Sequence, residues 1–268
     1  ECGYILAKNG MKVTILEREA QVGGCLQTFR RGAALFDTGF HYVGALGEGE
    51  SLHTLFSYFD LMSLPWKKLD EDCFDEVVIG EDTFAFANKH QRFYERMSAR
   101  FPKEREGLKK YVDILNQVGD HIFDSFNLQN EGTFTNSLFA RSAYEFLNET
   151  IKDPLLRKVL SGTSLKMELN APTLPLYTFA QINDSFIRSA WRLRGGGMQI
   201  ADKLVGGIEA MGGEVKTRAI VTYIKEEDGK VVGVTVNDED YLEADWVISS
   251  THPAYTVSLV GDSMKMRR

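Results

Sequence analysis

The chain has 268 residues, of which 43% are hydrophobic and 11% aromatic, so it is long enough for one large or two moderate globular domains. A formal net charge of -7 without a basic stripe argues against nucleic acid as a partner. The three cysteines are far apart with no His or Cys at ligand spacing, which argues against a metal site or a disulfide framework and favours a reducing, cytoplasmic setting. No apolar run approaches the ~18 residues of a membrane span, although peripheral membrane contact stays open.

Residues 1–9 have the apolar spacing of a helix, with Cys2 above Leu6 on one face. Asn9-Gly10 then provides a stop signal. The pattern predicts only the second half of a helix, so we expect the chain to be part of a longer protein.

A short apolar run over residues 13–16 predicts a strand buried on both faces of a parallel sheet, and an acid, Glu17, follows it. At the carboxyl end of the second strand of a dinucleotide-binding βαβ unit, a carboxylate can accept hydrogen bonds from both hydroxyls of an adenosine ribose. The alternative is an ordinary solvated Glu at a strand end, and this residue by itself does not separate the two.

Glycines and a polar motif follow Glu17 in a fixed order. Arg18 comes next, then Gly23-Gly24, where a backbone without Cβ can pass close to a ligand, and then D-T-G-F-H-Y over residues 37–42. With its E-R-x4-G-G pattern the chain resembles the two-domain FAD oxidoreductases. The segment GGCLQTFRRGAALFDTGFHYVG is similar to the phytoene desaturase, carotenoid isomerase and retinol saturase group, and especially to retinol saturases.

This resemblance implies an FAD site. Glu17 would hold the FAD ribose, and the segment that contains Asp37, Gly39 and His41 would lie towards the flavin ring. The residues implied to line the path of the cofactor are Arg18, Gly23 and Gly24. In that family a first strand and a G-x-G-x-x-G turn hold the pyrophosphate, and this sequence has no such turn, so we expect the 268-residue chain not to retain FAD.

The middle of the chain predicts a second domain. A helix over residues 52–59 precedes a β-hairpin over residues 74–79 and 83–87, and two helices follow over residues 91–100 and from 101 towards 126. Aromatic residues are frequent after that point: Phe123, Phe126, Phe134, Phe139, Tyr144 and Phe146. A helical core explains each of them, and together they could also line a tunnel for an apolar substrate.

Asp153-Pro154 predicts a helix start with Asp153 as the N-cap. A helix over residues 176–190 follows Pro175. Gly196 and Gly197 then belong to a glycine run that is either a hinge back into the cofactor domain or a close approach to a planar ligand. We expect both, which makes these two glycines candidates for cofactor binding.

From residue 198 the pattern becomes α/β again, with a helix over 198–210 and a strand over 214–217. Three antiparallel strands follow over residues 220–226, 230–236 and 241–244, with Asp228-Gly229 as the first turn. Such a meander precedes a further strand, here residues 246–250, in the FAD family. By resemblance the backbone at Val221 contacts the adenine, and Ser249 and Ser250 lie beside the cofactor.

The predicted fold is α/β: a partial Rossmann-like FAD-binding domain with a β-meander, plus an inserted α+β substrate domain. We place the FAD-binding domain at residues 1–64 and 190–268 and the substrate-binding domain at residues 65–189. By resemblance the longer protein is an FAD-dependent oxidoreductase acting on C=C bonds of an apolar polyene or isoprenoid, by saturation, desaturation or isomerisation. NAD(P)H could serve as its reductant.

His41 and Tyr42 are the candidates for delivering or orienting a proton, with a structural hydrogen-bonding role as the alternative for each. Two other functions stay open. An amine-oxidase-like flavoenzyme would share Glu17 and the double glycine but act on a polar amine, and the chain by itself could be an inactive or binding-only piece.

Overall fold

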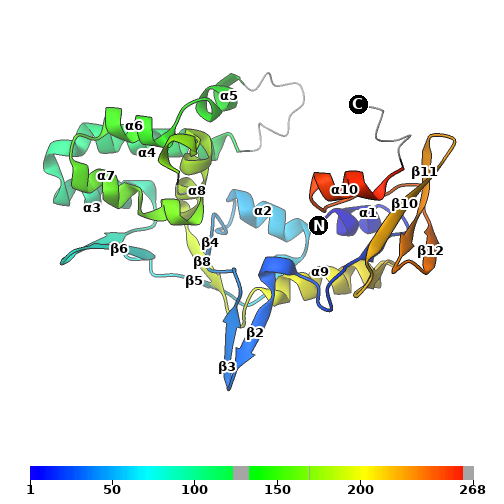
Figure 1. Ribbon diagram of the computed structural model, residues 1–268. Helices are drawn as coiled ribbons and strands as arrows, with labels where there is room; N and C mark the ends of the chain where they lie inside the picture. Colours follow the sequence, from blue (N-terminus) through cyan, green and yellow to red (C-terminus); the bar gives the residue numbers. More distant parts are fainter. Residues whose placement is uncertain (123–132, 169, 262–268) are drawn as a thin grey trace. The chain divides into compact units, whose positions relative to one another are not determined.

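The computed structural model describes residues 1–122, 133–168 and 170–261 (Figure 1). The chain forms two compact units, Glu1–Phe40 with Gly195–Arg268, and His41–Arg194. These boundaries differ from the predicted domains, because residues 41–64 and 190–194 group with the second unit. The reason is strand pairing: β4 (Val43–Gly44) and β5 (Trp66–Lys68) both pair antiparallel with β8 (Ala190–Leu193). The roles assigned to the two domains stay predictions.

The first unit opens with α1 (Cys2–Lys8) and β1 (Thr14–Leu16). β1 pairs in parallel with β9 (Glu214–Lys216), and α9 (Met198–Ala210) leads into β9. A Cβ on Gly207 of α9 would lie 2.5 Å from the Tyr4 ring of α1, so glycine allows the two helices to approach closely. Both predicted strands are thus present and parallel, but β1 is not buried on both faces as predicted, since Thr14 is exposed and Ile15 and Leu16 are only partly buried.

Two antiparallel sheets complete the first unit. β2 (Thr28–Arg31) and β3 (Ala34–Asp37) form a hairpin that follows the short η1 helix (Gly24–Leu26). The predicted meander is confirmed as β10 (Val221–Glu227), β11 (Lys230–Val236) and β12 (Asp240–Glu243), and α10 (Pro253–Leu259) follows. Asp228 and Gly229 both have positive φ, 50° and 77°, as a two-residue hairpin turn of type I′ requires.

The predicted strand over residues 246–250 is wrong, since this segment has no regular secondary structure. Trp246 is 80% exposed and Ile248 is 65% exposed, so the apolar run is not buried. A strand needs a neighbour for its backbone N–H and C=O groups, and no strand among the described residues pairs with this segment. Sequence pattern alone cannot supply that partner.

The second unit is built mainly from helices. They are α2 (Ser51–Tyr58), α3 (His90–Arg100), α4 (Arg105–Asp120), α5 (Thr133–Phe139), α6 (Ala143–Thr150), α7 (Pro154–Leu160) and α8 (Leu176–Arg188), with short 3-10 turns η2 (Leu61–Ser63), η3 (Pro102–Glu104), η5 (Gly162–Lys166) and η6 (Ala171–Thr173). β6 (Asp75–Ile79) and β7 (Asp82–Phe86) form the predicted hairpin. Asp153 caps α7 as predicted, because its Oδ1 accepts hydrogen bonds from Leu155 N at 2.8 Å and Leu156 N at 3.3 Å.

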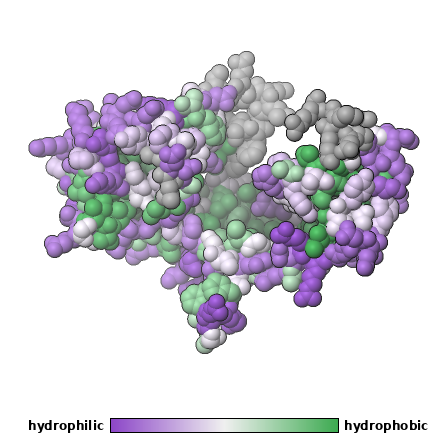
Figure 2. All heavy atoms as spheres, in the orientation of Figure 1, coloured by the Kyte–Doolittle hydropathy of each residue, from purple (hydrophilic) through white to green (hydrophobic). Residues whose placement is uncertain are grey.

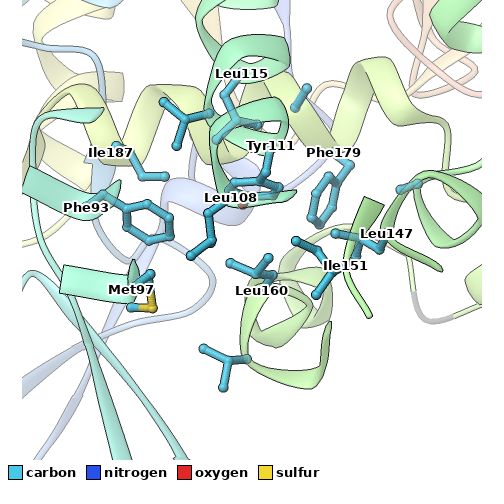
Figure 3. Close-up of a cluster of buried hydrophobic side chains, with 14 of the residues drawn as sticks. Phe93, Met97, Leu108, Tyr111, Leu115, Leu147, Ile151, Leu160, Phe179 and Ile187 are labelled. Carbon is cyan, nitrogen blue, oxygen red and sulfur yellow. The ribbon is translucent and has the colours of Figure 1, made fainter. Parts of the chain in front are cut away.

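The core of the second unit lies between α3, α4, α7 and α8 (Figure 3). Tyr111 and Leu115 of α4 are fully buried against Phe93 of α3 and Phe179 of α8. Ring centroids lie 6.1 Å apart for Phe93 and Tyr111 and 6.2 Å apart for Tyr111 and Phe179. Tyr111 and Leu115 of α4 therefore lie at the centre of this core.

The six aromatic residues that could line a substrate tunnel divide into three groups. Phe146 is buried, whereas Phe139 is 49% exposed and Tyr144 is 55% exposed, so a helical core does not account for these two. Phe123 and Phe126 lie outside the described residues, as does the side chain of Phe134. A tunnel lined by the whole set stays a prediction.

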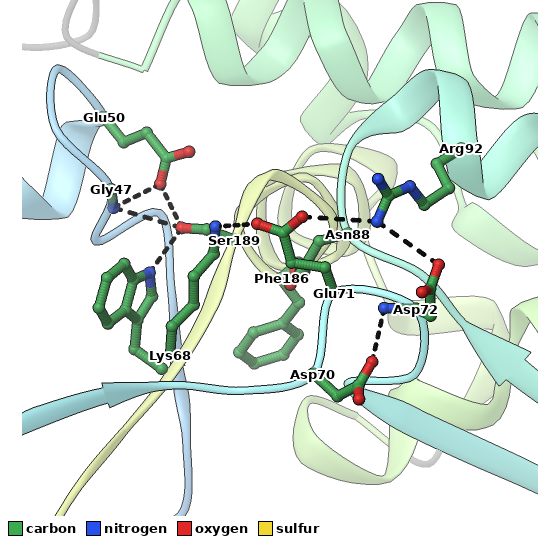
Figure 4. A network of polar contacts seen from close by, with 11 residues as sticks. Gly47, Glu50, Lys68, Asp70, Glu71, Asp72, Asn88, Arg92, Phe186 and Ser189 are labelled. Atoms are coloured by element: carbon green, nitrogen blue, oxygen red, sulfur yellow. Dashed lines mark hydrogen bonds and ion pairs between the residues drawn. The ribbon is translucent and has the colours of Figure 1, made fainter.

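Polar contacts tie β8 to the start of α2 and the end of α8 (Figure 4). Glu50 accepts a hydrogen bond from Gly47 N at 2.7 Å and another from the Ser189 hydroxyl, which itself accepts from Trp191 Nε1 at 2.9 Å. Asn88, which is buried, donates to the carbonyl of Phe186 at 2.8 Å. These bonds provide hydrogen-bond partners for backbone and side-chain groups that folding removes from water.

Polar residues cover much of the face seen in Figure 2, and apolar residues of the β2–β3 hairpin are visible among them. Phe29 and Phe36 face each other across the hairpin with ring centroids 5.5 Å apart, and both are more than 40% exposed. None of the helices described here has the length and apolar content needed to cross a membrane.

Candidate functional site

Glu17 lies directly after β1 and is half-buried. Its backbone is fixed at both groups: N donates to Lys216 O at 2.8 Å, and O accepts from Ala219 N at 2.9 Å. One carboxylate oxygen, Oε1, accepts from Glu19 N at 2.8 Å. No described residue donates to Oε2. A rigidly placed carboxylate with one unused oxygen fits the ribose-binding role expected of this residue.

Gly23 and Gly24 turn the chain a short distance after Glu17 in the sequence. Both have positive φ, 103° and 52°, which other residues rarely adopt. A Cβ on Gly24 would meet no atom within 4 Å, so the backbone there is open to a neighbouring group. Gly23 is packed instead, because its Cβ would lie 3.2 Å from Ala201 Cβ and 3.3 Å from Met198 Sδ. The turn thus rests on α9 and leaves Gly24 free to face a ligand.

Arg18 is exposed, and its guanidinium pairs with Glu19 at 2.9 Å. An adjacent, solvent-exposed pair of this kind contributes little to stability. Its expected position along the cofactor stays a prediction.

Asp37 and the glycine run meet at the base of the β2–β3 hairpin. Asp37 Oδ1 accepts from Gly197 N at 2.7 Å. A Cβ on Gly196, which has a φ of 91°, would lie 2.6 Å from Thr28 Cγ2, and a Cβ on Gly197 would lie 2.8 Å from Phe40 Cβ. Packing therefore accounts for both glycines. Their role toward a flavin stays a prediction, as does that of Gly39, whose Cβ would lie 3.4 Å from Cys25 O.

A small core joins three further parts of the predicted cofactor site. Leu16, Val221 and Val247 pack against the same buried cluster. This core brings the end of β1, the start of β10 and the segment before Ser249 together. The carbonyl of Val221 accepts from the Tyr255 hydroxyl at 3.4 Å.

Ser249 and Ser250 are both exposed. The Ser249 hydroxyl lies in a group of three hydroxyls, 3.0 Å from that of Thr251 and 2.7 Å from that of Thr256. Contact between these serines and a cofactor stays a prediction.

His41 and Tyr42 belong to the second unit. His41 is exposed, and its Nδ1 accepts from Tyr42 N at 2.8 Å. The Tyr42 hydroxyl donates to Asp75 and accepts from the Lys166 ammonium, which lies 3.0 Å from Asp75 Oδ2. The structural hydrogen-bonding role considered for Tyr42 is thus present, and a role in proton transfer stays a prediction.

Burial and the hydrogen bond to Asp75 raise the pKa of the Tyr42 hydroxyl above its usual range. For Asp75, partial burial acts to raise the pKa, but the hydrogen bonds from Tyr42 and Lys166 and the charge of Lys166 outweigh it and lower the pKa. The group is therefore a neutral phenol between a carboxylate and an ammonium.

Sequence reasoning missed Asp75 and Lys166. They lie 33 and 124 residues from Tyr42 in the chain, and only the folding of β6 and η5 brings all three together. No motif spacing could have shown this. Among the described residues, no group of His, Cys, Asp or Glu is arranged to hold a metal ion.

The family model for flavin containing amine oxidoreductases matches residues 2–261. The chain belongs to this family. The match supports FAD as the cofactor, and it includes Glu17, the Gly23-Gly24 turn, the meander and the segment up to Ser250.

Two curated relatives are similar to this chain over most of its length. An all-trans-retinol 13,14-reductase of Danio rerio is 30% identical over 272 residues, covering 91% of this chain and 44% of the relative. A chloroplastic prolycopene isomerase of Daucus carota is 21% identical over 263 residues, covering 91% of this chain and 43% of the relative. The chain thus spans less than half the length of these relatives.

A solved structure from Pyrococcus furiosus has the same fold, with a TM-score of 0.67, 20% sequence identity, and coverage of 99% of this chain and 59% of that protein. The expected partial FAD-binding fold and the resemblance to the retinol saturase and carotenoid isomerase group are therefore confirmed.

Proposed function

We propose that this chain is part of an FAD-dependent oxidoreductase that acts on C=C bonds of an apolar polyene or isoprenoid. The observation that carries the proposal is the similarity to a retinol reductase and a prolycopene isomerase over 91% of the chain. Retinol and prolycopene are both conjugated polyenes, which makes that substrate class the common element.

FAD, when bound, supplies the two-electron redox chemistry. In this proposal the Glu17 carboxylate binds the ribose through its unused oxygen, and the open backbone at Gly24 lines the adjoining part of the cofactor. The backbone at Val221 is proposed to contact the adenine, and Ser249 is proposed to lie beside the cofactor. A carboxylate that accepts a hydroxyl hydrogen bond contributes more than a neutral acceptor would.

The second unit is proposed to bind the substrate and exclude water. Its aromatic content supports an apolar ligand, and the exposed rings of Phe139 and Tyr144 offer apolar surface beyond the packed core. His41 and Tyr42 are proposed to deliver or orient a proton. An apolar small molecule, and no nucleic acid, is the proposed partner, in a cytoplasmic setting that allows peripheral membrane contact.

A substrate comparison with the full-length protein tests the proposal. Retinol, a carotenoid, a primary amine and a polyamine are each supplied anaerobically to the FAD-loaded protein, and reduction of the flavin is followed by its absorbance. The reverse reaction is followed by reducing the flavin, with NAD(P)H among the donors, and adding each polyene. Oxidation or reduction of the flavin by the polyenes, without a response to either amine, supports the proposal.

The second candidate is an amine oxidase, which the description of the matching family favours. Reduction of the flavin by amines, without any response to polyenes, would establish that function instead. A protein that binds FAD and responds to neither class would fit the inactive or binding-only alternative.

A further inference from the structure

We infer that Lys166, held by Tyr42 and Asp75, binds the terminal oxygen of a polyene alcohol or acid. The inference rests on the proposed substrate class and deepens it, because it favours polyenes with one oxygen-bearing end over pure hydrocarbons. All the residues involved lie in the second unit, His41–Arg194.

The hydrogen-bond inventory of Lys166 leaves one donor unused. An ammonium group has three N–H donors and no acceptor. One donates to the Tyr42 hydroxyl and one to Asp75 Oδ2 at 3.0 Å, and no further partner exists among the described residues. The other Asp75 oxygen, Oδ1, accepts from Glu76 N at 3.0 Å, so the carboxylate is fixed from its backbone side. The third N–H can therefore donate to a ligand oxygen.

Aromatic rings lie on one side of this donor. The Lys166 ammonium lies 4.1 Å from the centroid of the Tyr42 ring and 4.9 Å from that of Phe186. Tyr42 and Phe186 are 4.8 Å apart, and Phe74 packs edge-on against Tyr42 with centroids 6.2 Å apart. A charge-assisted hydrogen bond beside aromatic faces is stronger than the same bond in water.

The donor is also reachable. The side chains of Lys166 and Asp75 are 26% and 31% exposed, so a ligand atom can approach from one side. Leu165, the preceding residue of η5, is 79% exposed and adds apolar surface to the same turn. One charged donor with adjoining apolar surface suits a ligand that is apolar along its length and polar at its end.

A purely structural role would give the same three contacts without any effect on ligand choice. The ion pair between Lys166 and Asp75 would then stabilise β6 against η5, and its loss would weaken all ligands equally or none. The two roles differ in one measurable quantity: the ratio of affinities for oxygenated and hydrocarbon polyenes.

The experiment titrates this chain with three probes of the same polyene length: all-trans-retinol, all-trans-retinoic acid and the hydrocarbon deoxyretinol. Quenching of tryptophan fluorescence reports binding. We expect retinol and the acid to bind about tenfold or more tightly than the hydrocarbon, as one charge-assisted hydrogen bond provides. In Lys166→Met this ratio should fall to about one while hydrocarbon affinity stays within about twofold.

Lys109→Met is the matched control, since Lys109 forms an exposed ion pair with Asp113 at 3.3 Å in the same unit. It should keep the ratio of the unmodified chain. Lys166→Arg should keep a preference for the acid, because a guanidinium also donates to a carboxylate. Far-UV circular dichroism and a thermal melt establish that each variant is folded.

The affinities of the unmodified chain for the three probes already test the inference, whether or not a variant folds. Equal affinity for all three probes, or a preference that survives in folded Lys166→Met, overturns the inference and leaves the proposed polyene class standing. Binding of none of the three probes overturns the inference, and the substrate comparison with the FAD-loaded full-length protein then decides the proposed polyene class.

Discussion

Glu17 and Glu19 follow the same strand, yet their surroundings differ. Glu17 is half-buried, with its backbone fixed by Lys216 and Ala219, whereas the side chain of Glu19 is 61% exposed and pairs with Arg18. A cofactor site needs a group whose position is set before the ligand arrives. Glu17 meets that requirement and Glu19 does not.

Glu17→Gln in the full-length protein should weaken FAD binding by about 1–2 kcal/mol, because a ribose hydrogen bond loses its charge assistance. Glu19→Gln should leave the affinity unchanged, which makes it the matched control. Isothermal titration of the apoprotein with FAD measures both. If the unmodified protein and Glu17→Gln bind FAD with equal affinity, Glu17 is an ordinary acid at a strand end.

Asp75 links the stability of the second unit to pH. Its folded-state pKa is lowered, since the hydrogen bonds from Tyr42 and Lys166 outweigh partial burial. A lowered pKa means that the folded state holds the proton less tightly than the unfolded chain does. The stabilisation is therefore present above the ordinary Asp pKa and is lost as the pH falls through the folded-state value.

Asp75→Asn tests this linkage. At pH 7 the variant should be less stable than the unmodified chain, and the difference should shrink as the pH falls below the ordinary Asp pKa and the carboxylate of the unmodified chain takes up its proton. Urea unfolding at a series of pH values, followed by circular dichroism, gives the difference. A gap that stays constant from neutral to acid pH would show that the Asp75 charge contributes nothing.

At the scale of elements, α4 and α8 approach closely at a glycine. Asp184 of α8 is buried; its Oδ2 accepts from Arg188 Nε at 2.7 Å, and its Oδ1 lies 2.8 Å from His90 Nε2. A Cβ built on Gly119 of α4 would lie 1.9 Å from Asp184 Oδ2. The missing side chain of Gly119 thus makes room for a buried carboxylate between two basic groups.

Gly119→Ala should lower the free energy of unfolding by about 1–3 kcal/mol, because the carboxylate must move away from Arg188 and His90. Gly206→Ala is the matched control: Gly206 is also inside a helix, α9, but a Cβ there would meet no atom within 4 Å. It should raise stability by about 0.5–1 kcal/mol through helix propensity. Chemical denaturation compares them, and similar changes in both would mean that α4 and α8 do not restrain this position.

Helices and hairpins were predictable because their signals are local. The N-cap at Asp153 and the turn at Asp228-Gly229 are each specified by neighbouring residues, and both are present. Residues 13–16 and 246–250 are both short apolar runs, but only the first has a strand beside it in the structure. Strand formation depends on a distant partner, so the same local pattern gave one correct and one wrong prediction.

At the scale of the whole molecule, some parts of the candidate sites have local sequence signals, and others depend on contacts between distant residues. Glu17 and the Gly23-Gly24 turn are close in sequence, so a motif could show them. Asp75 and Lys166 meet Tyr42 from distant parts of the chain, and nothing in their spacing connects them. The boundary between the units shifted for a similar reason, since β4 and β8, both from segments that were assigned to the cofactor domain, share a sheet with β5 of the substrate domain.

The two units also differ in how much apolar surface they bury, and this leads to a prediction for the whole chain. The second unit contains a large continuous core around Tyr111, Leu115 and Phe179, whereas the core around Ile224 and Val234 in the first unit is small. Local opening needs less free energy where fewer apolar contacts break.

Native-state hydrogen exchange, read by mass spectrometry, should therefore find the slowest amides in α4 and α8. Amides of β1 and β9 should exchange faster, because a sheet of two short strands is weak by itself. Exposed α1 serves as an internal reference for fast exchange, since Ala7 is its one buried residue. Equal protection of β1 and α4 would mean that the chain opens only by global unfolding, and it would contradict the difference in stability that the two cores imply.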